Sequence, residues 1–351
     1  MKLVMKRMTA LILALALAAA LSLTACAESS ARVFTDSVGR EVTVPQEINR
    51  IAVTGPLGQI VVFAIAPDMY VGIPNAWNDA AREFLDEQYV NLPVIGQLYG
   101  SKGELNLEEL LKAAPQVVID IGEPKSSIAE DMDTLTEQTG IPCVHISAYI
   151  DRMDETYAML GELLGREEEA RVLSETCTRI YSRAVEMMER VEKANLLYVT
   201  GAKGLNVLAR GGFQSTVIDM MSNNLAVVEK VSSKGTGNEV DMEQILTWNP
   251  DVIIFSEDSI YDTVADDPVW QSVSAIANNA YYQVPFGPYN WLAQPASVQR
   301  LLGIMWMGKL LYPEAADYDL YDEVAQFYLL FYLCDLTQAQ YDALMARSIG
   351  K

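Results

Sequence analysis

The pattern Asn106-Leu107-Glu108-Glu109-Leu110-Leu111 is followed closely by the run Pro115-Gln116-Val117-Val118-Ile119-Asp120. The second half of the chain repeats this order with Asp241-Met242-Glu243-Gln244-Ile245-Leu246 and Pro250-Asp251-Val252-Ile253-Ile254-Phe255. Each copy begins with a residue that favours a helix N-terminus and carries Glu or Gln three positions later, as in a capping box. Each copy therefore predicts a short helix that ends before a proline, followed by a buried strand.

One such unit is an ordinary step of an α/β fold, but two copies far apart in the chain indicate two lobes of similar topology. The residues around the copies continue the alternation of strands and helices. Residues 34–44 alternate around Gly39 and predict a β-hairpin that Pro45 ends. Further strands are expected at 51–53, 70–73, 196–199 and 281–284, and further helices at 57–65, 295–311 and 320–333. A last helix after Cys334 is expected to pack on the second lobe.

Residues 152–193 separate the two halves and consist almost only of helix-forming residues, interrupted by Gly165. Apolar residues recur at helical spacing on both sides of this glycine. The second helix, which begins near Glu167, is long enough to run along most of a lobe. We expect it to act as a rigid strut between the lobes rather than as a flexible tether.

The chain carries 47 acidic residues against 25 Lys and Arg, which gives a net charge of −22. Such a chain repels phosphate backbones, so no nucleic-acid partner is expected. His145 is the only histidine, so a metal site with several histidine ligands is excluded and no metal site is predicted. A structural role is the interpretation for His145, with direct metal ligation as the alternative. The cysteines at 143, 177 and 334 are expected to be free and mostly buried, with one disulfide as the alternative.

The first residues have the composition of an export signal. Cations within the first seven residues precede an uncharged run rich in Leu and Ala at 11–23, shorter than the ~20 residues that a membrane span needs. We interpret residues 1–25 as a signal peptide, with a transmembrane anchor as the alternative. Leu23-Thr24-Ala25-Cys26 resembles the bacterial lipobox, which implies that Cys26 becomes lipidated. Residues 26–32 would then tether the protein to the outer face of the cell membrane.

Thr35-Asp36-Ser37-Val38-Gly39-Arg40 and Arg50-Ile51-Ala52-Val53 resemble the opening of the substrate-binding lipoproteins of ABC importers for iron complexes and cobalamin. The repeated units and Leu301-Leu302-Gly303-Ile304-Met305-Trp306 are similar to the middle and end of the same family. The resemblance covers nearly all of the mature chain. It implies two Rossmann-like lobes with central, mostly parallel sheets, joined by a long rigid helix, with the ligand in the cleft between them. The lobes would span residues 33–151 and 194–351, with 152–193 as the helical linker.

The resemblance also implies partners. A permease and its ATPase would receive the ligand, and one exposed glutamate near the start of the repeated helix in each lobe would dock onto the permease. The matching positions are Glu108 and Glu243. Acids in a first helical turn also favour the helix dipole, and both roles are compatible. We expect a monomer without a permanently bound cofactor.

Ligands of open α/β lobes lie beyond the carboxyl ends of the strands, which directs attention to loops. The candidate loops are 54–58, 96–102, 122–125, 201–212, 256–258 and 286–291. In the last of these, Tyr289 and Trp291 are candidates to stack on a planar chelate, and Asn290 to hydrogen-bond its oxygens. The alternative is a loop that packs its own aromatic side chains into a small core.

Four further side chains are candidate ligand contacts. Trp77 and Tyr99 are aromatic candidates from the first lobe. Lys203 and Arg210 lie in predicted loops of an otherwise acidic chain, where they would attract an anionic ligand. A solvated surface position is the alternative for each of the two cations.

The function expected from these features is binding rather than catalysis. The sequence has no Gly-x-Ser-x-Gly elbow, no Walker loop and no His-Glu-x-x-His, so no enzyme is expected. We expect a lipid-anchored solute-binding protein that captures an Fe(III) complex of the siderophore type, because a chelated metal needs few protein ligands. The alternatives are haem, cobalamin or an oxyanion such as molybdate as the ligand, or an anchored receptor that serves a sensor. The rigid strut predicts only modest closure of the lobes.

Overall fold

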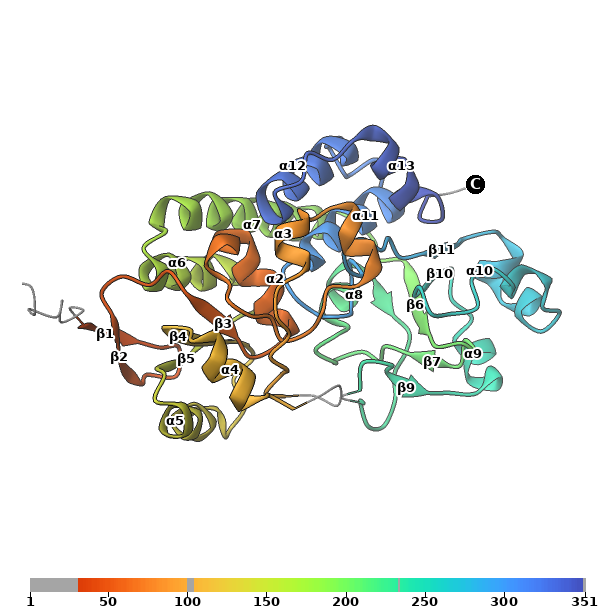
Figure 1. Cartoon of the computed structure of the whole chain (residues 1–351). Coiled ribbons are helices and arrows are strands. Elements are labelled where there is room, and N and C mark those ends of the chain that lie inside the picture. Colours follow the sequence, from red (N-terminus) through yellow and green to blue (C-terminus); the bar gives the residue numbers. More distant parts are fainter. Residues whose placement is uncertain (1–30, 100–103, 233, 350–351) are drawn as a thin grey trace, which may run out of the picture.

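The computed structural model describes residues 31–99, 104–232 and 234–349. Two α/β lobes lie side by side, and a layer of helices packs along one side of both (Figure 1). The first lobe is built from the N-terminal half of the chain and the second from the C-terminal half. This arrangement confirms the predicted fold class. The predicted signal peptide, Cys26 and most of the predicted tether lie outside the described residues.

The first lobe is built on a three-stranded parallel sheet in the order β3 (Ile51–Val53), β4 (Val117–Gly122) and β5 (Cys143–Ser147). Helix α2 (Pro56–Ile65) packs on one face, and α4 (Leu107–Ala113) and α5 (Ile128–Thr139) pack on the other. All six residues of β4 are buried, as expected for a parallel sheet covered on both faces.

Several shorter elements surround this sheet. The predicted hairpin is present as the antiparallel pair β1 (Ala31–Thr35) and β2 (Glu41–Pro45), with Gly39 in the turn at φ +80°. The strand expected at 70–73 was wrong, because only single bridges form there, from Tyr70 to Ile51 and from Ile73 to Val94. The connection between α2 and α4 contains η1 (Pro67–Met69), η2 (Asp79–Glu83) and α3 (Glu87–Val90).

The second lobe repeats this plan around three parallel strands, with β10 (Val252–Phe255) between β6 (Asn195–Thr200) and β11 (Tyr281–Gln283). Two-residue strands extend the sheet: β7 (Asn206–Val207), β8 (Asn223–Asn224) and β9 (Asn238–Glu239). The helical segments of this lobe are α8 (Thr216–Met221), α9 (Met242–Trp248), η3 (Val264–Asp266), η4 (Trp270–Ser272) and α10 (Ser274–Ala277).

The repeated sequence units form the same local structure in both lobes. The Asn106 side chain accepts hydrogen bonds from the first turn of α4, and the Asp241 side chain does so for α9. Each helix ends at a left-handed residue, Ala114 at φ 48° and Asn249 at φ 40°, directly before the proline. The strand that follows is the central one of its parallel set, because β4 and β10 each pair on both sides. The prediction of two lobes with the same internal unit is confirmed.

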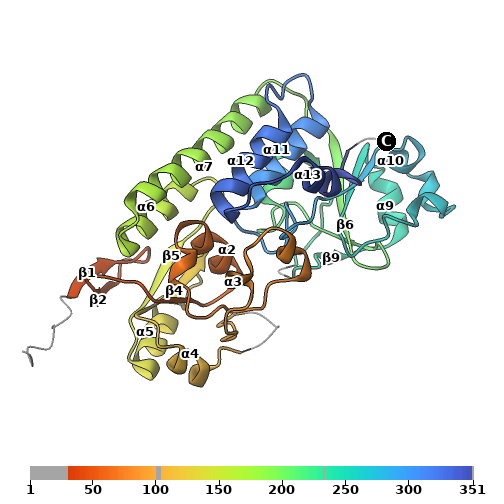
Figure 2. The same cartoon turned by 45° about the horizontal axis from the view of Figure 1, so that its top comes forward.

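The strut is present as α6 (Met153–Leu164) and α7 (Glu167–Met188), which meet at Gly165 with φ +65°. The apolar side of α7 is buried along its whole length, from Ala170 to Met187. Helix α7 contacts α2 of the first lobe and α8 of the second. Figure 2 shows α6 and α7 running along one side of the molecule, which places the strut where a rigid connection requires it.

The C-terminal helices tie the lobes together a second time. Helix α11 (Arg300–Leu311) begins five residues later than expected, because residues 295–299 form a loop. Helix α12 (Leu320–Tyr332) packs on α11 and also on α2 of the first lobe. Helix α13 (Gln338–Met345) adds a bond from Gln340 to the Glu83 carbonyl of the first lobe. The last helix therefore contacts both lobes, not the second lobe alone.

Within the described residues, Cys143, Cys177 and Cys334 are free, as predicted, and the first two are buried. None of the described helices is long and apolar enough to cross a membrane.

Candidate functional site

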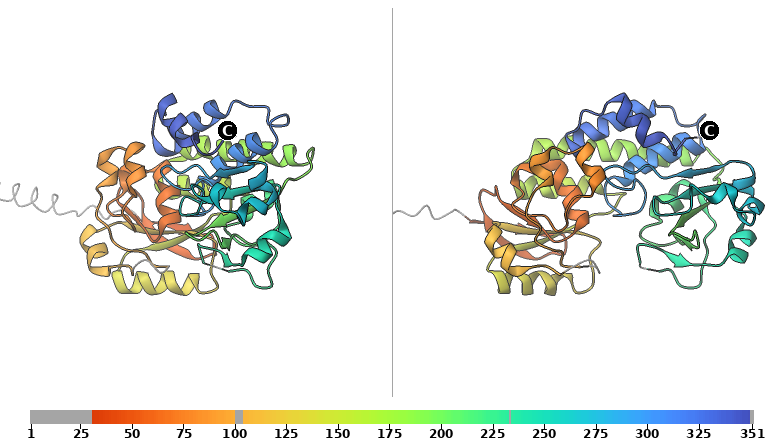
Figure 3. Two further views of the ribbon diagram at one scale, coloured as in Figure 1. Left: turned by 90° about the vertical axis from the view of Figure 1, so that its right-hand side faces the viewer. Right: turned by 45° about the vertical axis from the view of Figure 1, so that its right-hand side comes forward.

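A cleft of about 530 Å³ lies between the two lobes. The first lobe contributes residues 54–57 and 120–125 together with Tyr99 and Ile128, and the second contributes Phe213, Gln214 and Ser232. Figure 3 shows the lobes facing each other below the helical layer. Segments 54–57 and 120–125 include the carboxyl ends of β3 and β4 and the start of α2, where ligands of open α/β sheets bind. The volume falls within the ~300–1,000 Å³ typical of small-molecule sites.

Tyr99 lines the cleft, as predicted from the sequence, and it belongs to a small polar cluster. Its hydroxyl donates to Asp131 over 2.6 Å, and the Lys125 ammonium lies 3.1 Å from the centre of its ring. Burial and the bond to Asp131 raise the pKa of Tyr99, so its phenol stays neutral. Burial lowers the pKa of Lys125, although the carboxylates of Asp120 and Asp131 oppose this effect. The cluster offers a ligand an aromatic ring and a nearby cation.

One carboxylate that lines the cleft is positioned by two neighbouring side chains. Asp120, on β4, accepts a hydrogen bond from the Thr54 hydroxyl and lies 2.7 Å from Nδ1 of His145, on β5. His145 is fully buried, and the Ser147 hydroxyl lies 3.5 Å from its other ring nitrogen. These contacts favour the structural interpretation of His145. Among the described residues, no group of three metal-binding side chains is close enough to hold an ion.

A buried cation stands behind the second-lobe wall of the cleft. Arg300, at the start of α11, is 2% exposed and donates to the carbonyls of Phe213 and Ser297. Its guanidinium carbon lies 5.0 Å from the centre of the Phe213 ring, which faces the cleft. Burial lowers the pKa of Arg300 to about 10, with the Glu123 carboxylate of the first lobe acting against this, so the group is charged at neutral pH.

Loop 286–291 folds into the core, as the alternative interpretation of this segment expected. Trp291 is fully buried beside Tyr328, with the ring centres 6.5 Å apart. Asn290 is 1% exposed, and its amide donates to Tyr198 and Glu257. Its side-chain oxygen accepts from two backbone amides, so the polar group is fully occupied. Their burial removes Asn290 and Trp291 from the surface that a ligand in the cleft can reach.

Trp77 and Tyr289 meet where the two lobes touch, outside the cleft lining. Their ring centres are 5.8 Å apart, and Trp77 also packs edge-on against Phe63 at 5.3 Å. Nearby, the Asn78 side chain donates to the Pro288 carbonyl over 2.6 Å. These contacts join the lobes, so both aromatic residues act in the structure as inter-lobe packing.

The two cations chosen from the second lobe also lie away from the cleft lining. Lys203 is exposed in the turn between β6 and β7. The Arg210 guanidinium donates to the Asn224 carbonyl over 2.8 Å and to the Asn223 side chain over 2.6 Å. Arg210 therefore ties β8 to its own loop instead of facing the ligand space.

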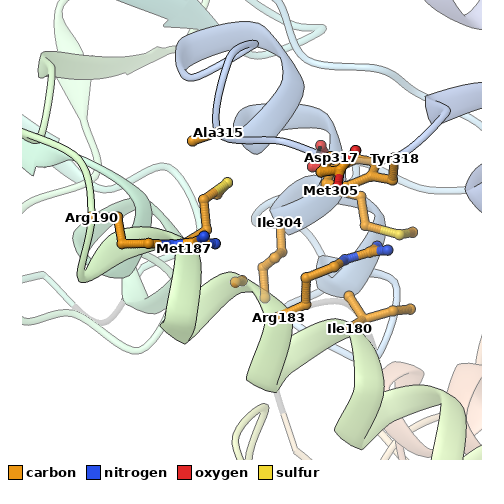
Figure 4. A pocket seen from close by; sticks show the side chains of 10 residues that line it. Ile180, Arg183, Met187, Arg190, Ile304, Met305, Ala315, Asp317 and Tyr318 are labelled. Carbon is orange, nitrogen blue, oxygen red and sulfur yellow. Dashed lines mark hydrogen bonds between the residues drawn. The ribbon is translucent and has the colours of Figure 1, made fainter.

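A second, much smaller cavity of about 50 Å³ lies between α7 and α11 (Figure 4). Its wall includes Ile180, Met187, Ile304 and Met305, with Arg183 at one side. Since one water needs at least ~10–15 Å³ of such space, the cavity has room for a few waters and not for a solute of chelate size.

Glu108 and Glu243 occupy equivalent exposed positions in the first turns of α4 and α9. Within the part of the chain that the structure describes, neither carboxylate forms a hydrogen bond or an ion pair with another side chain. Both charges are therefore available to a partner.

Two matched lobes, a rigid helical connection and a cleft between them define a bilobal solute-binding protein. The chain belongs to the periplasmic binding protein family, whose model matches residues 85–287, more than half of the chain. It is a binding protein and not an enzyme, and it works outside the cytoplasm with the permease and ATPase of an ABC transporter. The solutes of such proteins are transported cargo, so no cofactor is permanently bound.

The comparisons include three informative relatives. The chain is 24% identical to the molybdate-binding protein MolA of Haemophilus influenzae, over 86% of this chain and 91% of that protein. It is 23% identical to the iron-uptake system-binding protein of Bacillus subtilis, over 69% and 75%. The structure of an ABC transporter solute-binding protein from Sulfurospirillum deleyianum superposes with a TM-score of 0.81, at 25% identity over 90% of this chain and 99% of that one.

Sequence reasoning missed several residues of the cleft. Asp120 is the polar end of the first repeated strand, so the rule that ligands sit at strand ends would have found it. Phe213 and Gln214 directly follow the predicted loop 201–212, which ended two residues too early. No pattern in the sequence predicts that Arg300 lies near the cleft, because it stands within an apolar run that indicates only a buried helix.

Proposed function

We propose that this protein captures an iron complex of the siderophore type in the inter-lobe cleft and delivers it to its permease. The observation that carries the proposal is the cleft itself, about 530 Å³ in volume and lined by both lobes. Much of its surface is apolar, with Leu57, Ile121 and Phe213 beside the Tyr99 ring. Such a wall suits the organic shell of a chelate, whereas a five-atom oxyanion would fill a small part of it. The likeness to an iron-uptake binding protein agrees with this choice.

We further propose that Cys26 carries a lipid anchor and that the protein acts as a monomer. The anchor would hold the protein beside its permease without a membrane-spanning helix. In this arrangement Glu108 and Glu243, one in each lobe, would contact cationic side chains of the permease. Two charges on separate lobes would fix the orientation of the docked protein as well as attract it.

Molybdate is the second candidate ligand, and two observations favour it. One relative is a molybdate-binding protein that matches most of the chain. The buried Arg300 also supplies positive potential behind Phe213, which would favour an anion. Against this, the guanidinium already donates to two carbonyl groups and faces the Glu123 carboxylate.

Native mass spectrometry of the protein purified from its own host tests the choice of ligand. We expect an added mass that contains iron and an organic chelator and that is lost on denaturation. An added mass equal to molybdate, or binding of added sodium molybdate that excludes every ferric complex, would contradict the proposal. The variant Phe213→Ala should weaken retention of the chelate, since it removes an aromatic wall of the cleft. The variant Val269→Ala, at an exposed site distant in sequence, is its control.

Docking is tested separately with the permease and ATPase reconstituted in vesicles. The double variant Glu108→Ala with Glu243→Ala should lower transport about tenfold or more while ligand binding stays normal. Equal transport by the double variant and the unchanged protein would rule out this docking role. The control is Glu109→Ala with Gln244→Ala, which alters neighbouring residues on the same two helices.

A further inference from the structure

The Asp120 carboxylate is a firmly positioned polar group of the cleft. It lies at the carboxyl end of β4, is 6% exposed and lines the cavity. One oxygen accepts from the Thr54 hydroxyl, and the other lies 2.7 Å from Nδ1 of His145. A carboxylate has about four acceptor positions, so these two contacts leave acceptor capacity directed at the cavity.

One tautomer of His145 matches both of its side-chain neighbours. The Ser147 hydroxyl lies beside Nε2 at 3.5 Å, where it can donate to that nitrogen. With Nε2 as an acceptor, Nδ1 carries the hydrogen and donates to Asp120. The Thr54 hydroxyl and the His145 ring therefore orient the carboxylate from the side away from the cavity.

Other ionisable groups around the cleft do not reverse this negative charge. Among the described residues that line the cavity, the acids are Asp120 and Glu123 and the cation is Lys125, while Asp131 and Arg300 are outside the lining. The Lys125 ammonium rests on the Tyr99 ring, whose hydroxyl is bonded to Asp131. Arg300 is enclosed behind Phe213. Acids therefore outnumber cations among the described residues that line the cleft, in a protein whose whole charge is −22.

We propose that Asp120 makes the cleft select ferric chelates of zero or positive charge that present N–H or O–H donors, the hydroxamate type, over trianionic catecholate complexes. This inference rests on the proposed function and narrows its ligand class. Three hydroxamates neutralise Fe(III), whereas three catecholates leave three negative charges on the complex. A trianion placed against a buried carboxylate suffers like-charge repulsion in a poorly solvated site, while a donor group on a neutral or cationic chelate gains a charge-assisted bond.

Quenching of intrinsic fluorescence by two ferric probes tests the inference. The probes are ferrioxamine B, a cationic hydroxamate complex, and ferric enterobactin, a trianionic catecholate complex. For the unchanged protein we expect ferrioxamine B to bind about 100-fold more tightly or better. Asp120→Asn should weaken the binding of ferrioxamine B about 10- to 100-fold and strengthen the binding of the catecholate complex. Glu137→Gln, which removes the same charge from the exposed side of α5, should change either affinity less than about twofold.

The outcomes separate this inference from the function on which it rests. If neither ferric probe binds, the proposed function fails and this inference fails with it. If the catecholate complex binds as tightly as ferrioxamine B, or if Asp120→Asn leaves their ratio unchanged, the inference alone is overturned and iron-complex binding stands.

A second measurement keeps the test decisive if Asp120→Asn unfolds. Added sodium chloride should weaken ferrioxamine B binding to the unchanged protein, because salt screens the attraction. Glu123→Gln, at an exposed position, should also weaken the binding of ferrioxamine B. The loss should be smaller than the one expected for Asp120→Asn. Tighter binding of ferrioxamine B in high salt would overturn the inference.

Discussion

At the scale of single residues, Asn290 shows how a side chain suited to a ligand can serve the fold. Its amide nitrogen donates to the Tyr198 hydroxyl over 2.9 Å and to the Glu257 carboxylate over 2.7 Å. Its oxygen accepts from the amides of Leu292 and Ala293. Asn290 therefore links the end of the second sheet to the loop that enters α11.

Replacing Asn290 should damage stability and spare ligand binding. Asn290→Ala removes these four bonds and leaves Glu257 without its amide donor, so we expect a loss of about 2–4 kcal/mol in the free energy of unfolding. Urea denaturation measures this loss. The matched control is Asn91→Ala, because Asn91 is exposed and its side chain makes one long contact to Glu87. A stable Asn290→Ala protein that no longer binds its ligand would reverse the assignment and return this residue to the site.

At the scale of elements, the repeated helix–proline–strand unit explains why Glu108 and Glu243 occupy equivalent positions. Asn106 and Asp241 cap α4 and α9, and each cap fixes the turn that carries the exposed glutamate. A helix of seven residues has little stability of its own, so its cap matters more than in a long helix.

Removing either cap should therefore loosen the helix that it caps, α4 or α9, without disturbing the cleft. Asn106→Ala and Asp241→Ala should each lower the free energy of unfolding by about 1 kcal/mol. Asn106→Asp should retain most of the stability, because aspartate caps a helix equally well. Amide hydrogen exchange would show faster exchange confined to α4 or α9. Unchanged exchange in α4 and α9 would show that tertiary packing alone maintains these helices.

The contact between α7 and α12 should depend on pH. Burial acts to raise the pKa of Glu323 on α12, but hydrogen bonds from Arg183 and Arg179 on α7 outweigh this and hold the pKa below the usual value of a glutamate. An acid with a lowered pKa in the folded state stabilises the protein above its unfolded pKa and loses that effect as pH falls. Glu323→Gln should thus cost about 1 kcal/mol at neutral pH and progressively less below about pH 4.5. A constant difference between the two proteins across that range would contradict the role of the charge.

The same scale shows what the sequence could and could not predict. The repeated units and α7 were predictable because caps, prolines and helical periodicity act within a few residues. The packing of loop 286–291 could not be decided from the sequence, because Trp291 packs on Tyr328 of α12 and Tyr289 on Trp77 of the first lobe, both distant in the sequence. Of the seven proposed ligand contacts, Tyr99 alone is among the described residues that line the cleft. The order of the strands decides which loops meet there, and the sequence does not determine that order.

At the scale of the whole molecule, one apolar core runs through both lobes and the helices between them. It includes Val53 and Phe63 of the first lobe, Leu173 of the strut, and Tyr198 and Phe327 of the second half. Each sheet has a second core on its outer face, limited to its own lobe. A wide hinge motion would separate the packed side chains of the shared core. We therefore expect the lobes to move little relative to each other.

Solution scattering with and without ligand tests this rigidity. We expect the radius of gyration to change by less than about 1 Å when the chelate binds. The variant Leu173→Ala, which cuts into the shared core at α7, should lower stability by about 2–5 kcal/mol. A compaction of several ångströms on binding would show that the strut bends.

Anomalous diffraction at the iron absorption edge, from crystals of the protein loaded with ferrioxamine B, tests the central claim most directly. The account predicts one strong iron peak in the cleft between Asp120 and Phe213, with Tyr99 at its side. An iron peak elsewhere on the protein, or a cleft without iron in crystals that contain the chelate, would contradict it.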